Sequence, residues 1–361
     1  MKIEVITIGE LATFAESALY KNFHDIPITR LRALSQSQNP RASTNDVALL
    51  VAHEDNRLLS YIGLMPDLCH LDEQPVKIWW NSCWWANETE KNNGSMQLFY
   101  MACKLTNGRL YFPELTPHTT NLLSRMKGFG IQNVEGVRGY LKMNFAVLLP
   151  ARKKEFLKLR PLLRLIDFGV NLLFSPVCWG KGKRLSKKDL DYKVLDRIDD
   201  ETAGFIGKHN THELFRRNKL DINWMIDYPW ITKENLQSDQ HYAFSHQAKS
   251  FGVRVVKVYQ DKHMCGFFML LIRDGNAKLT YCYSEPDYIP HLIDVLYKQL
   301  LENKVFTFVT FDQRISEYIQ NHSNPFLHTR KQVKTIAFPE EVSSRINSHT
   351  IQDGDGDCFF V

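Results

Sequence analysis

The chain has little that would mark it as a disulfide-bonded, zinc-binding or membrane-spanning protein. Its seven cysteines are odd in number, scattered along the sequence, and include no Cys-x-x-Cys pair. A disulfide framework or a zinc site is therefore not expected, and a reducing cytoplasm fits this cysteine usage best. No apolar run approaches the roughly 20 residues that a membrane-spanning helix needs. The opening residues carry acids at Glu4 and Glu10, so a secretion signal is not expected either.

What the chain does have is the composition of a globular protein. It contains 361 residues, of which 44% are hydrophobic and 24% charged. This composition predicts a packed core, and the length suffices for two domains of ordinary size. We predict an N-terminal domain over 1–150, a basic helical linker over 151–190, a C-terminal domain over 191–345 and an acidic tail over 346–361.

The positive charge is concentrated in one segment. Residues 151–188 contain 11 Lys and Arg against two acids, whereas the whole chain has a net charge of only +5. Because the basic character is local, a nucleic-acid-binding face spread over a domain is not expected. Basic and apolar residues alternate at helical spacing here. One interpretation is a solvated helix that packs on the domains, and the other is peripheral contact with an anionic membrane surface.

The most informative stretch runs from residue 76 to residue 105. Val76–Trp85 is rich in large aromatic and β-branched residues and predicts a strand. Ala86–Gly94 is polar and predicts a loop, and Ser95–Leu105 has the apolar spacing of a helix with one buried face. A strand, a glycine-bearing loop and a helix direct backbone N–H groups and a helix dipole at one place, which suits a phosphate. Lys91 adds a positive charge, although most such junctions bind nothing.

The order of elements in the first half predicts a mixed sheet with helices on its faces. The expected strands are Lys2–Ile8, Val47–His53, Leu58–Leu64, Val76–Trp85, Arg109–Phe112 and Val134–Leu148. The expected helices are Leu11–Phe23, Ser95–Leu105 and Thr116–Lys127, and residues 35–46 are expected to form a polar loop.

The second half repeats this order, which indicates an internal duplication of topology. Its expected strands are Gly252–Val258, Cys265–Ile272, Leu279–Tyr283, Phe306–Phe311 and Val333–Phe338, and its expected helices are Pro290–Leu301 and Ile315–Asn321. The predicted fold class is therefore α/β (α+β), with two mixed, mainly antiparallel sheets flanked by helices and joined by a basic helical connector.

This succession resembles the GNAT acyltransferase superfamily, twice over. The family binds the pyrophosphate of an acyl-coenzyme A through a loop of the form [Arg/Gln]-x-x-Gly-x-[Gly/Ala]. In this sequence the motif falls on residues 91–96, where Met96 replaces the small residue. The resemblance implies that acetyl-CoA or another acyl-CoA is a substrate. It assigns the cofactor contacts to Lys91, Asn92, Asn93, Gly94 and Ser95.

A second family signature is a helix that ends in Gly-Phe, with an Asn near its start. Asn121 and Gly128-Phe129 match it, so the resemblance places Asn121 on the cofactor side. The family commonly has a Tyr a few residues before this Gly, which protonates the leaving thiolate. Ser124 stands at that position and is the corresponding candidate catalytic residue, with water or another residue as the alternative proton donor.

A transferase of this type also needs a base for the acceptor. Glu114 follows the predicted strand 109–112, at a strand end where side chains face the cleft of such sheets, and Glu88 and Glu90 in the loop are alternatives. An ordinary exposed acid at a helix start is the competing interpretation of Glu114. Cys83, within the aromatic strand, is interpreted as a buried small residue and not as a nucleophile.

Two tryptophans are candidates for substrate contact. Trp79, Trp80, Trp84 and Trp85 fall in pairs on the two faces of a strand, where a core role is the default and a sugar-stacking platform at Trp85 is the sharper hypothesis. Trp224 lies in a segment, Leu220–Ile231, that resembles the start of the second unit in tandem GNAT proteins linked to bacterial polysaccharide biosynthesis.

The second half has no glycine in the corresponding loop, Ser284–Tyr288, and is not expected to hold pyrophosphate. The resemblance therefore implies an N-acyltransferase that acts on an amino group, on an amino sugar or a cell-surface polysaccharide precursor. The rival hypotheses are a Fem-type aminoacyl transferase, whose family shares a related tandem arrangement, and a non-catalytic GNAT-like binding or scaffold protein.

No metal is expected. His209 and His212 have helical spacing but no nearby cysteine. The tail sequence DGDGDCFF places Asp353, Asp355 and Asp357 like the first half of a calcium loop, but Cys358 occupies the glycine position and no later Glu exists. We therefore expect a turn that docks Phe359 and Phe360 on the body of the protein.

Overall fold

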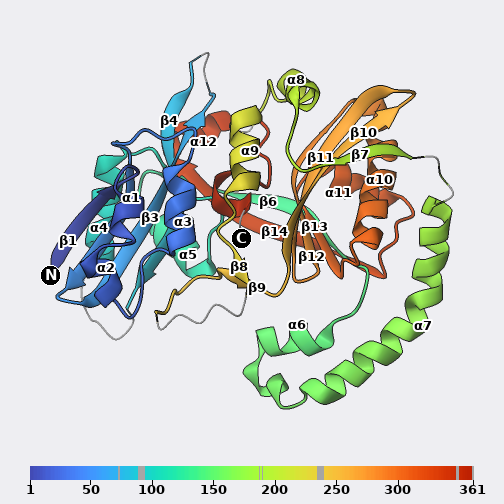
Figure 1. Cartoon of the computed structure of the whole chain (residues 1–361), viewed down its shortest axis with the longest axis horizontal. Coiled ribbons are helices and arrows are strands. Elements are labelled where there is room, and N and C mark those ends of the chain that lie inside the picture. Colours follow the sequence, from blue (N-terminus) through green and yellow to red (C-terminus); the bar gives the residue numbers. More distant parts are fainter. Residues whose placement is uncertain are drawn as a thin grey trace. The chain divides into compact units, whose positions relative to one another are not determined.

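The computed structural model describes all residues except 72–73, 88–93, 187, 189, 234–239, 347–348 and 360–361 (Figure 1). The chain forms two compact units, and both are discontinuous in sequence. Unit 1 comprises Met1–Val134, Asp196–Phe251 and Lys334–Val361, and unit 2 comprises Glu135–Leu195 and Gly252–Val333. The two units are thus interleaved along the chain, and the consecutive domain limits at 150, 190 and 345 stay a prediction.

Unit 1 is built on a five-stranded sheet with the order β1-β2-β3-β4-β5. Neighbouring strands are antiparallel except β4 and β5, which are parallel. The predicted hairpin is confirmed, and its turn places Asp55 at a φ of 50°. The strands are β1 (Lys2–Thr7), β2 (Val47–Glu54), β3 (Arg57–Cys69), β4 (Val76–Ala86) and β5 (Leu110–Tyr111).

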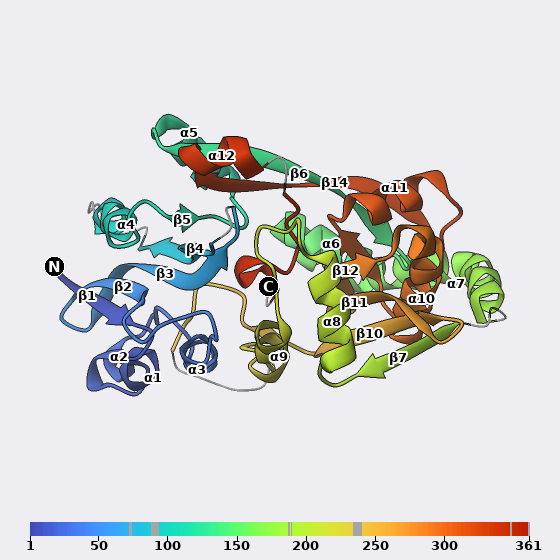
Figure 2. The same ribbon diagram turned by 90° about the horizontal axis from the view of Figure 1, so that it is seen from above.

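Helices cover both faces of this sheet, as Figure 2 shows. One face packs on α1 (Leu11–Phe14), α2 (Ala18–Asn22) and α3 (Arg30–Ser37), and the other packs on α4 (Gly94–Leu105). The single helix expected over Leu11–Phe23 is in fact two short ones. The polar loop expected over residues 35–46 is wrong at its start, because α3 continues to residue 37.

Local signals set the ends of the helices around β5. Helix α4 ends before Asn107 and Gly108, whose φ angles are 51° and 74°, as expected for a left-handed C-terminal turn. Helix α5 (Pro117–Arg125) begins at Thr116, whose side chain accepts a hydrogen bond from the Thr119 amide. The helix predicted at 116–127 is therefore confirmed.

The rest of unit 1 comes from the middle and the end of the sequence. It contains α8 (Asp200–His209), α9 (Lys219–Asp227), the short pair β8 (Thr232–Lys233) and β9 (Gln247–Ala248), α12 (Glu340–Ile346) and the 3-10 turn η3 (Gly356–Phe359). Backbone hydrogen bonds of 2.8 Å join Ile26 to His241 and Phe112 to Ala337, so distant segments are integral to this unit.

Unit 2 is built on a seven-stranded sheet with the order β14-β6-β13-β12-β11-β10-β7. The helices α10 (Ile289–Glu302) and α11 (Gln313–Asn321) pack on its core. Strand β6, from the first half of the sequence, pairs antiparallel with β13, with Tyr140 opposite Thr307. The strands are β6 (Phe129–Tyr140), β7 (Asp191–Leu195), β10 (Phe251–Gln260), β11 (His263–Arg273), β12 (Asn276–Ser284), β13 (Thr307–Thr310) and β14 (His328–Pro339). The part of β6 before Glu135 and the part of β14 after Val333 belong to unit 1.

The connector of unit 2 is helical, as predicted. It consists of α6 (Phe145–Arg152), a 3-10 turn η1 (Lys154–Leu157) and the long helix α7 (Arg160–Ser186). The strand expected to reach Leu148 is wrong beyond residue 140, because α6 begins at residue 145. Among the described residues, no helix combines the length and the apolar character that a membrane crossing requires.

Candidate functional site

The parallel strands of unit 1 pair over a very short distance. The pairs are Trp79 with Leu110 and Trp80 with Tyr111, after which β5 ends while β4 continues to Ala86. The next residue, Phe112, forms a bridge with Ala337 instead. The two parallel strands therefore part at their carboxyl ends, which is the edge where sheets of this kind bind ligands.

A β-bulge lies in β4 directly beyond this point. Gly63 pairs with Cys83 and Leu64 pairs with Asn81, so Ser82 is an extra residue. The bulge changes the alternation of side chains along the strand. Trp79 and Trp84 consequently pack on the α4 face, whereas Trp80 and Trp85 lie on the other face. Two tryptophans therefore lie on each face, as predicted, but the bulge places Trp79 with Trp84, where simple alternation along the strand would place it with Trp85.

The bulge requires a glycine opposite it. A Cβ at Gly63 would lie 2.5 Å from the Cys83 sulfur and 2.9 Å from the Ser82 hydroxyl oxygen. Because both neighbours belong to a buried strand, we expect Gly63→Ala to lower the free energy of unfolding by about 1–3 kcal/mol. Gly204→Ala is the matched control, since its Cβ would meet no atom within 4 Å. Urea midpoints check this, and equal midpoints for the two variants would contradict it.

The amino end of α4 follows β4 at the same edge of the sheet. Gly94 is buried, and the Ser95 hydroxyl accepts a 2.8 Å hydrogen bond from the indole nitrogen of Trp84. The Trp84 ring stacks on Phe99 at 4.9 Å, which fixes the first turn of α4 against the end of β4. Met96 packs against the apolar cluster beneath α4. The first turn of a helix presents backbone amides and a positive dipole end, which favours an anion.

Five predicted loop residues lie outside the described residues. They are the cofactor candidates Lys91, Asn92 and Asn93 and the alternative bases Glu88 and Glu90. Of the motif that the sequence predicts, the structure therefore places Gly94, Ser95 and Met96.

The other catalytic candidates are exposed. Glu114 follows β5, so it lies beyond the same sheet edge as the amino end of α4. Asn121 and Ser124 lie together on α5, where the Ser124 hydroxyl donates a 2.9 Å hydrogen bond to the Asn121 carbonyl oxygen. The Glu114 carboxyl group and the Ser124 hydroxyl are therefore both accessible to solvent.

The two candidate substrate tryptophans differ in their surroundings. Trp85 is half-buried and stacks on Tyr61 with ring centroids 5.5 Å apart, so part of its ring faces outward. Trp224 is only 6% exposed, and its indole nitrogen donates to the Ser35 carbonyl oxygen at 2.8 Å. Trp224 therefore joins α9 to α3 inside unit 1, whereas Trp85 is partly exposed.

A buried arginine, which the sequence analysis missed, holds the bulge from the face opposite α4. Arg32 donates to the Ser82 carbonyl oxygen at 3.0 Å, to the Asp357 carboxylate at 2.9 Å and to the Tyr242 hydroxyl at 3.0 Å. Its guanidinium also lies over the Trp230 ring at 4.6 Å. An arginine on a short helix gives no sequence signal for such contacts.

Polar groups beside the bulge are buried and not saturated by hydrogen bonds. The Tyr61 and Ser82 hydroxyls have no hydrogen-bond partner within the described part of the chain. Burial raises the pKa of the Tyr61 hydroxyl and of the Cys83 thiol. Cys83 is therefore a neutral thiol at physiological pH, which agrees with its interpretation as a buried small residue.

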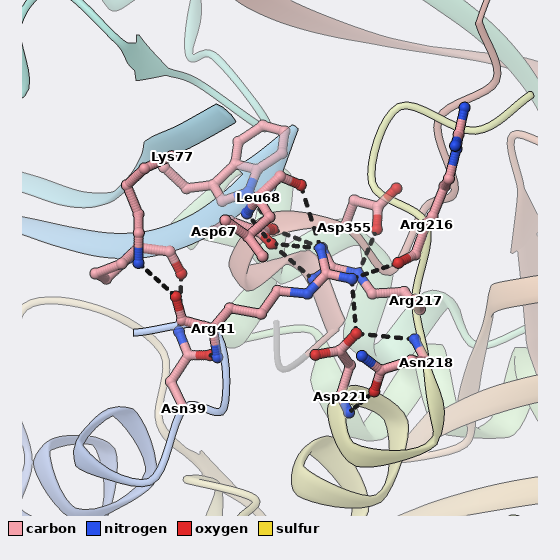
Figure 3. Close-up of polar contacts among 12 residues, drawn as sticks. Asn39, Arg41, Asp67, Leu68, Lys77, Arg216, Arg217, Asn218, Asp221 and Asp355 are labelled. Atoms are coloured by element: carbon pink, nitrogen blue, oxygen red, sulfur yellow. Dashed lines mark hydrogen bonds and ion pairs between the residues drawn. The ribbon is translucent and has the colours of Figure 1, made fainter. Parts of the chain in front are cut away.

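A second buried cluster is ionic (Figure 3). Asp67, on β3, accepts two hydrogen bonds from Arg217 at 2.7 and 3.0 Å and one from Arg41 at 2.8 Å. The indole nitrogen of Trp80 and the backbone amide of Leu68 also donate to it, at 2.8 and 2.7 Å. Burial alone would raise the pKa of Asp67, but the Arg217 and Arg41 guanidinium groups hold it well below its usual range.

Two further acids complete this ionic cluster. Asp221, at the start of α9, accepts from Arg41 at 2.6 Å and from the Asn218 amide at 2.8 Å. Asp355, in the tail, accepts from the Arg217 Nε at 2.9 Å, and burial raises the pKa of its carboxyl group. The cluster is thus a fully enclosed joint between three segments that lie far apart in sequence.

The tail uses all of its acids in such contacts. Asp353 pairs with Lys334, Asp355 with Arg217 and Asp357 with Arg32. Phe359 is completely buried, which confirms its predicted docking, and Phe360 lies outside the described residues. Among the described residues, no group of three or more His, Cys, Asp or Glu would hold a metal ion.

Comparison with known proteins gives a likeness in structure only. No family model matches the chain, and no curated protein matches it. A protein of Enterococcus faecalis V583, described as a probable N-acyltransferase, matches with 10% identity and a TM-score of 0.51 over 96% of this chain and 74% of its own. Saccharomyces cerevisiae N-myristoyltransferase with bound myristoyl-CoA matches with 8% identity and a TM-score of 0.49 over 94% of this chain and 78% of its own.

A GCN5-related N-acetyltransferase from Anabaena variabilis ATCC 29413 matches with 7% identity and a TM-score of 0.44 over 93% of this chain and 72% of its own. At these identities a likeness shows the fold alone. The chain has a mixed α/β fold with two mixed sheets flanked by helices, as the sequence predicted, and it shares its overall fold with the Enterococcus faecalis protein.

Proposed function

We propose that the chain is an acyl-CoA-dependent N-acyltransferase. The observation that carries this proposal is the parallel pair β4 and β5, which stops pairing after Trp80 and Tyr111. The separation lies directly before a bulge and leads into the amino end of α4. An overall fold shared with a probable N-acyltransferase supports the same conclusion. The tandem arrangement of two such folds is part of the proposal.

The donor diphosphate would be held at the amino end of α4. Gly94 and Ser95 supply the first helical turn, and the family resemblance adds Lys91, Asn92 and Asn93 before it and Asn121 opposite. Backbone amides at a helix start bind phosphate without any charged side chain. Met96, which departs from the family motif, packs against the apolar cluster beneath α4.

When bound, the acyl-CoA supplies an activated acyl group. Glu114 would take the proton from the acceptor amine, directly or through water, and Ser124 would stand near the leaving thiolate as a proton donor. The acceptor that we propose is an amino sugar or a polysaccharide precursor. The outward part of the Trp85 ring would provide a stacking surface for such a sugar.

The experiment is thermal stabilisation by acetyl-CoA. A ligand at 100 times its dissociation constant stabilises the folded state by about 2.7 kcal/mol, so a clear rise in melting temperature is expected. Gly94→Trp would fill the start of α4, and Lys91→Glu would reverse the charge of the loop. Both are expected to abolish the rise, whereas Gly204→Trp, at a position with no atom within 4 Å of its Cβ, should preserve it.

The remaining outcomes decide between the rival functions. No rise in melting temperature at millimolar acetyl-CoA would overturn the proposal and favour a GNAT-like binding or scaffold protein. Stabilisation by an aminoacyl-tRNA, without any effect of acetyl-CoA, would point to the Fem-like function. Stabilisation by a nucleotide-linked sugar alone would indicate recognition without transfer.

A further inference from the structure

A pocket opens in the connector of unit 2, where α6 packs against α7 (Figure 1). Its volume is about 280 Å³, close to the roughly 300 Å³ at which sites for small molecules begin. The residues that line it include Lys142, Arg160, Arg164, Asp167, Asn171 and Phe306. We name this site the basic pocket. All of these residues belong to unit 2, so the pocket lies within one unit.

Helix α7 contributes a polar stripe to the basic pocket. The stripe consists of Arg160, Arg164, Asp167 and Asn171. Their intervals of four, three and four residues place them on one side of the helix. The side of a helix that faces its neighbours is usually apolar. A polar stripe on this side indicates that α7 makes specific polar contacts there.

Two residues of the stripe bind the backbone around the start of α6. Both oxygens of the buried Asp167 carboxylate accept hydrogen bonds, from the Phe145 amide at 2.6 Å and from the Ala146 amide at 2.9 Å. The Asn171 side chain bonds both the amide and the carbonyl of Met143, each at 2.9 Å. These contacts fix the wall of the pocket, and they occupy its one acid with backbone amides at a helix start.

The three cations of the basic pocket lack an acidic partner. Among the described residues, no acid forms an ion pair with Lys142, Arg160 or Arg164. The Lys142 ammonium lies over the Phe306 ring, 5.6 Å from its centroid, and the Lys142 amide donates to the Phe306 carbonyl oxygen at 3.2 Å. The chain just beyond β6 thus positions one cation, and α7 positions the other two. With Asp167 as the only lining acid, the pocket has a net charge of 3 − 1 = +2.

This charge and these donor groups fit a phosphate monoester. Such a group has a charge of about −1.5 to −2 near neutral pH and three strong acceptor oxygens. A guanidinium group binds phosphate oxygens through paired N–H donors, and an ammonium group adds a compact charge. Val147 and Phe306 also line the pocket and supply apolar surface for the carbon skeleton that carries the phosphate.

We propose that the basic pocket binds a small soluble molecule that carries a phosphate monoester. Arg160 and Arg164 would donate to the terminal phosphate oxygens, and Lys142 would approach them from the side of Phe306. Asp167 would keep its bonds to α6, so the wall of the site is in place before the ligand arrives. The proposal is independent of acyl transfer, because none of its residues belongs to the proposed transfer site.

The experiment is calorimetric titration of the full chain with glycerol 3-phosphate and with glycerol. We expect a dissociation constant of about 1 mM or lower for glycerol 3-phosphate. Glycerol should not bind, because the three cations supply the attraction and glycerol has no charge. Absence of binding of glycerol 3-phosphate, or equal binding of the two compounds, would overturn the proposal.

Double variants on α7 test whether the two arginines form the site. Arg160→Gln with Arg164→Gln should weaken binding by about tenfold or more, because each change removes charge-assisted hydrogen bonds. Arg160→Lys with Arg164→Lys keeps the charge but removes the paired donors, and should weaken binding by about fivefold. Arg30→Gln with Arg57→Gln, on exposed side chains of unit 1, is the matched control and should bind like the wild type. Wild-type affinity in the Lys variant, or an equal loss in the control, would assign the binding to diffuse charge and overturn the proposal.

Three further measurements fix the place and the kind of ligand. Lys142→Gln, which lies on a different element, should weaken binding by about fivefold, and unchanged binding would overturn the proposal. Gly94→Trp, at the proposed transfer site, should bind glycerol 3-phosphate like the wild type, and loss of binding there would assign the phosphate to that site instead. Vesicles that contain phosphatidic acid present the same group on a lipid, and binding to them that glycerol 3-phosphate does not displace would overturn the proposal of a soluble ligand.

Discussion

Replacing Asp67 with Asn is expected to lower the free energy of unfolding by about 3–5 kcal/mol, because it breaks a buried ionic cluster on one side only. The Asp67 carboxylate is 1% exposed and accepts five hydrogen bonds, three of them from Arg41 and Arg217. Asn offers one oxygen and a donor group in its place. Both guanidinium groups would then remain buried and would lose the carboxylate that they share, leaving Arg41 with Asp221 and Arg217 with Asp355.

Asp355→Asn is the matched control within the same cluster. Asp355 is also enclosed, and it accepts hydrogen bonds from the Arg217 Nε and the Gln352 amide, at 2.9 Å each. Burial raises the pKa of its carboxyl group, so the folded protein already disfavours its charge. We expect a loss of about 1 kcal/mol, the usual value for one hydrogen bond. Urea unfolding followed by tryptophan fluorescence measures both variants, and an equal loss in the two would contradict this assignment.

The two acids should also respond to pH in opposite directions. The folded pKa of Asp67 lies below the value of about 3.9 expected for an unfolded Asp. Its stabilisation is therefore present above about pH 4 and is lost as the pH falls further. The folded pKa of Asp355 is raised, so its contribution falls as the pH rises above about 4. The destabilisation by Asp67→Asn should be smaller at pH 3 than at pH 7, and that by Asp355→Asn should be larger at pH 4 than at pH 7.

The sequence predicted those parts of the fold that local patterns determine. The hairpin of β2 and β3 follows from two apolar runs around a turn-forming tetrad, and its turn residue Asp55 has a positive φ. Helices α4 and α5 follow from apolar spacing, a capping Thr116 and a terminal glycine. In each case the determining residues are neighbours in the chain.

The missed parts depend on contacts between distant residues. Helix α3 buries Arg32 and Gln36, so its inner face is polar and lacks the apolar periodicity of a helix. The partner of Arg32 is Asp357, 325 residues away, and the partners of Asp67 are 26 and 150 residues away. The three aspartates of the tail alternate in the sequence, but no neighbouring residue identifies the Lys and Arg side chains with which they pair.

In the candidate site too, the features that local patterns determine could be predicted, and those that depend on strand pairing could not. The aromatic strand and the following helix carry their own patterns, so the position of Gly94 at the start of α4 follows from sequence. The bulge at Ser82 does not, because it arises from the register of β3 against β4 and from the space that Gly63 leaves. The point at which β4 and β5 separate could therefore not be predicted from the sequence, because it depends on how the strands pair.

Glu114→Gln is expected to have the largest effect on transfer. If Glu114 takes the proton of the acceptor amine, its amide should lower the turnover number by about 10²–10⁴-fold, the usual contribution of general base catalysis. Acetyl-CoA should still raise the melting temperature of this variant, since Glu114 is not among the proposed donor contacts. Release of free CoA in the presence of nucleotide-linked amino sugars measures the turnover.

Two comparisons make this result specific to Glu114. Glu317→Gln removes an exposed acid of unit 2 and should leave turnover unchanged. Ser124→Ala should lower turnover less than Glu114→Gln, because water reaches the exposed position of Ser124 and would replace its hydroxyl as the proton donor. An unchanged turnover in Glu114→Gln would assign the base to another group, with Glu88 and Glu90 next in order. A Ser124→Ala loss as large as that of Glu114→Gln would instead show that proton transfer to the leaving thiolate limits the rate.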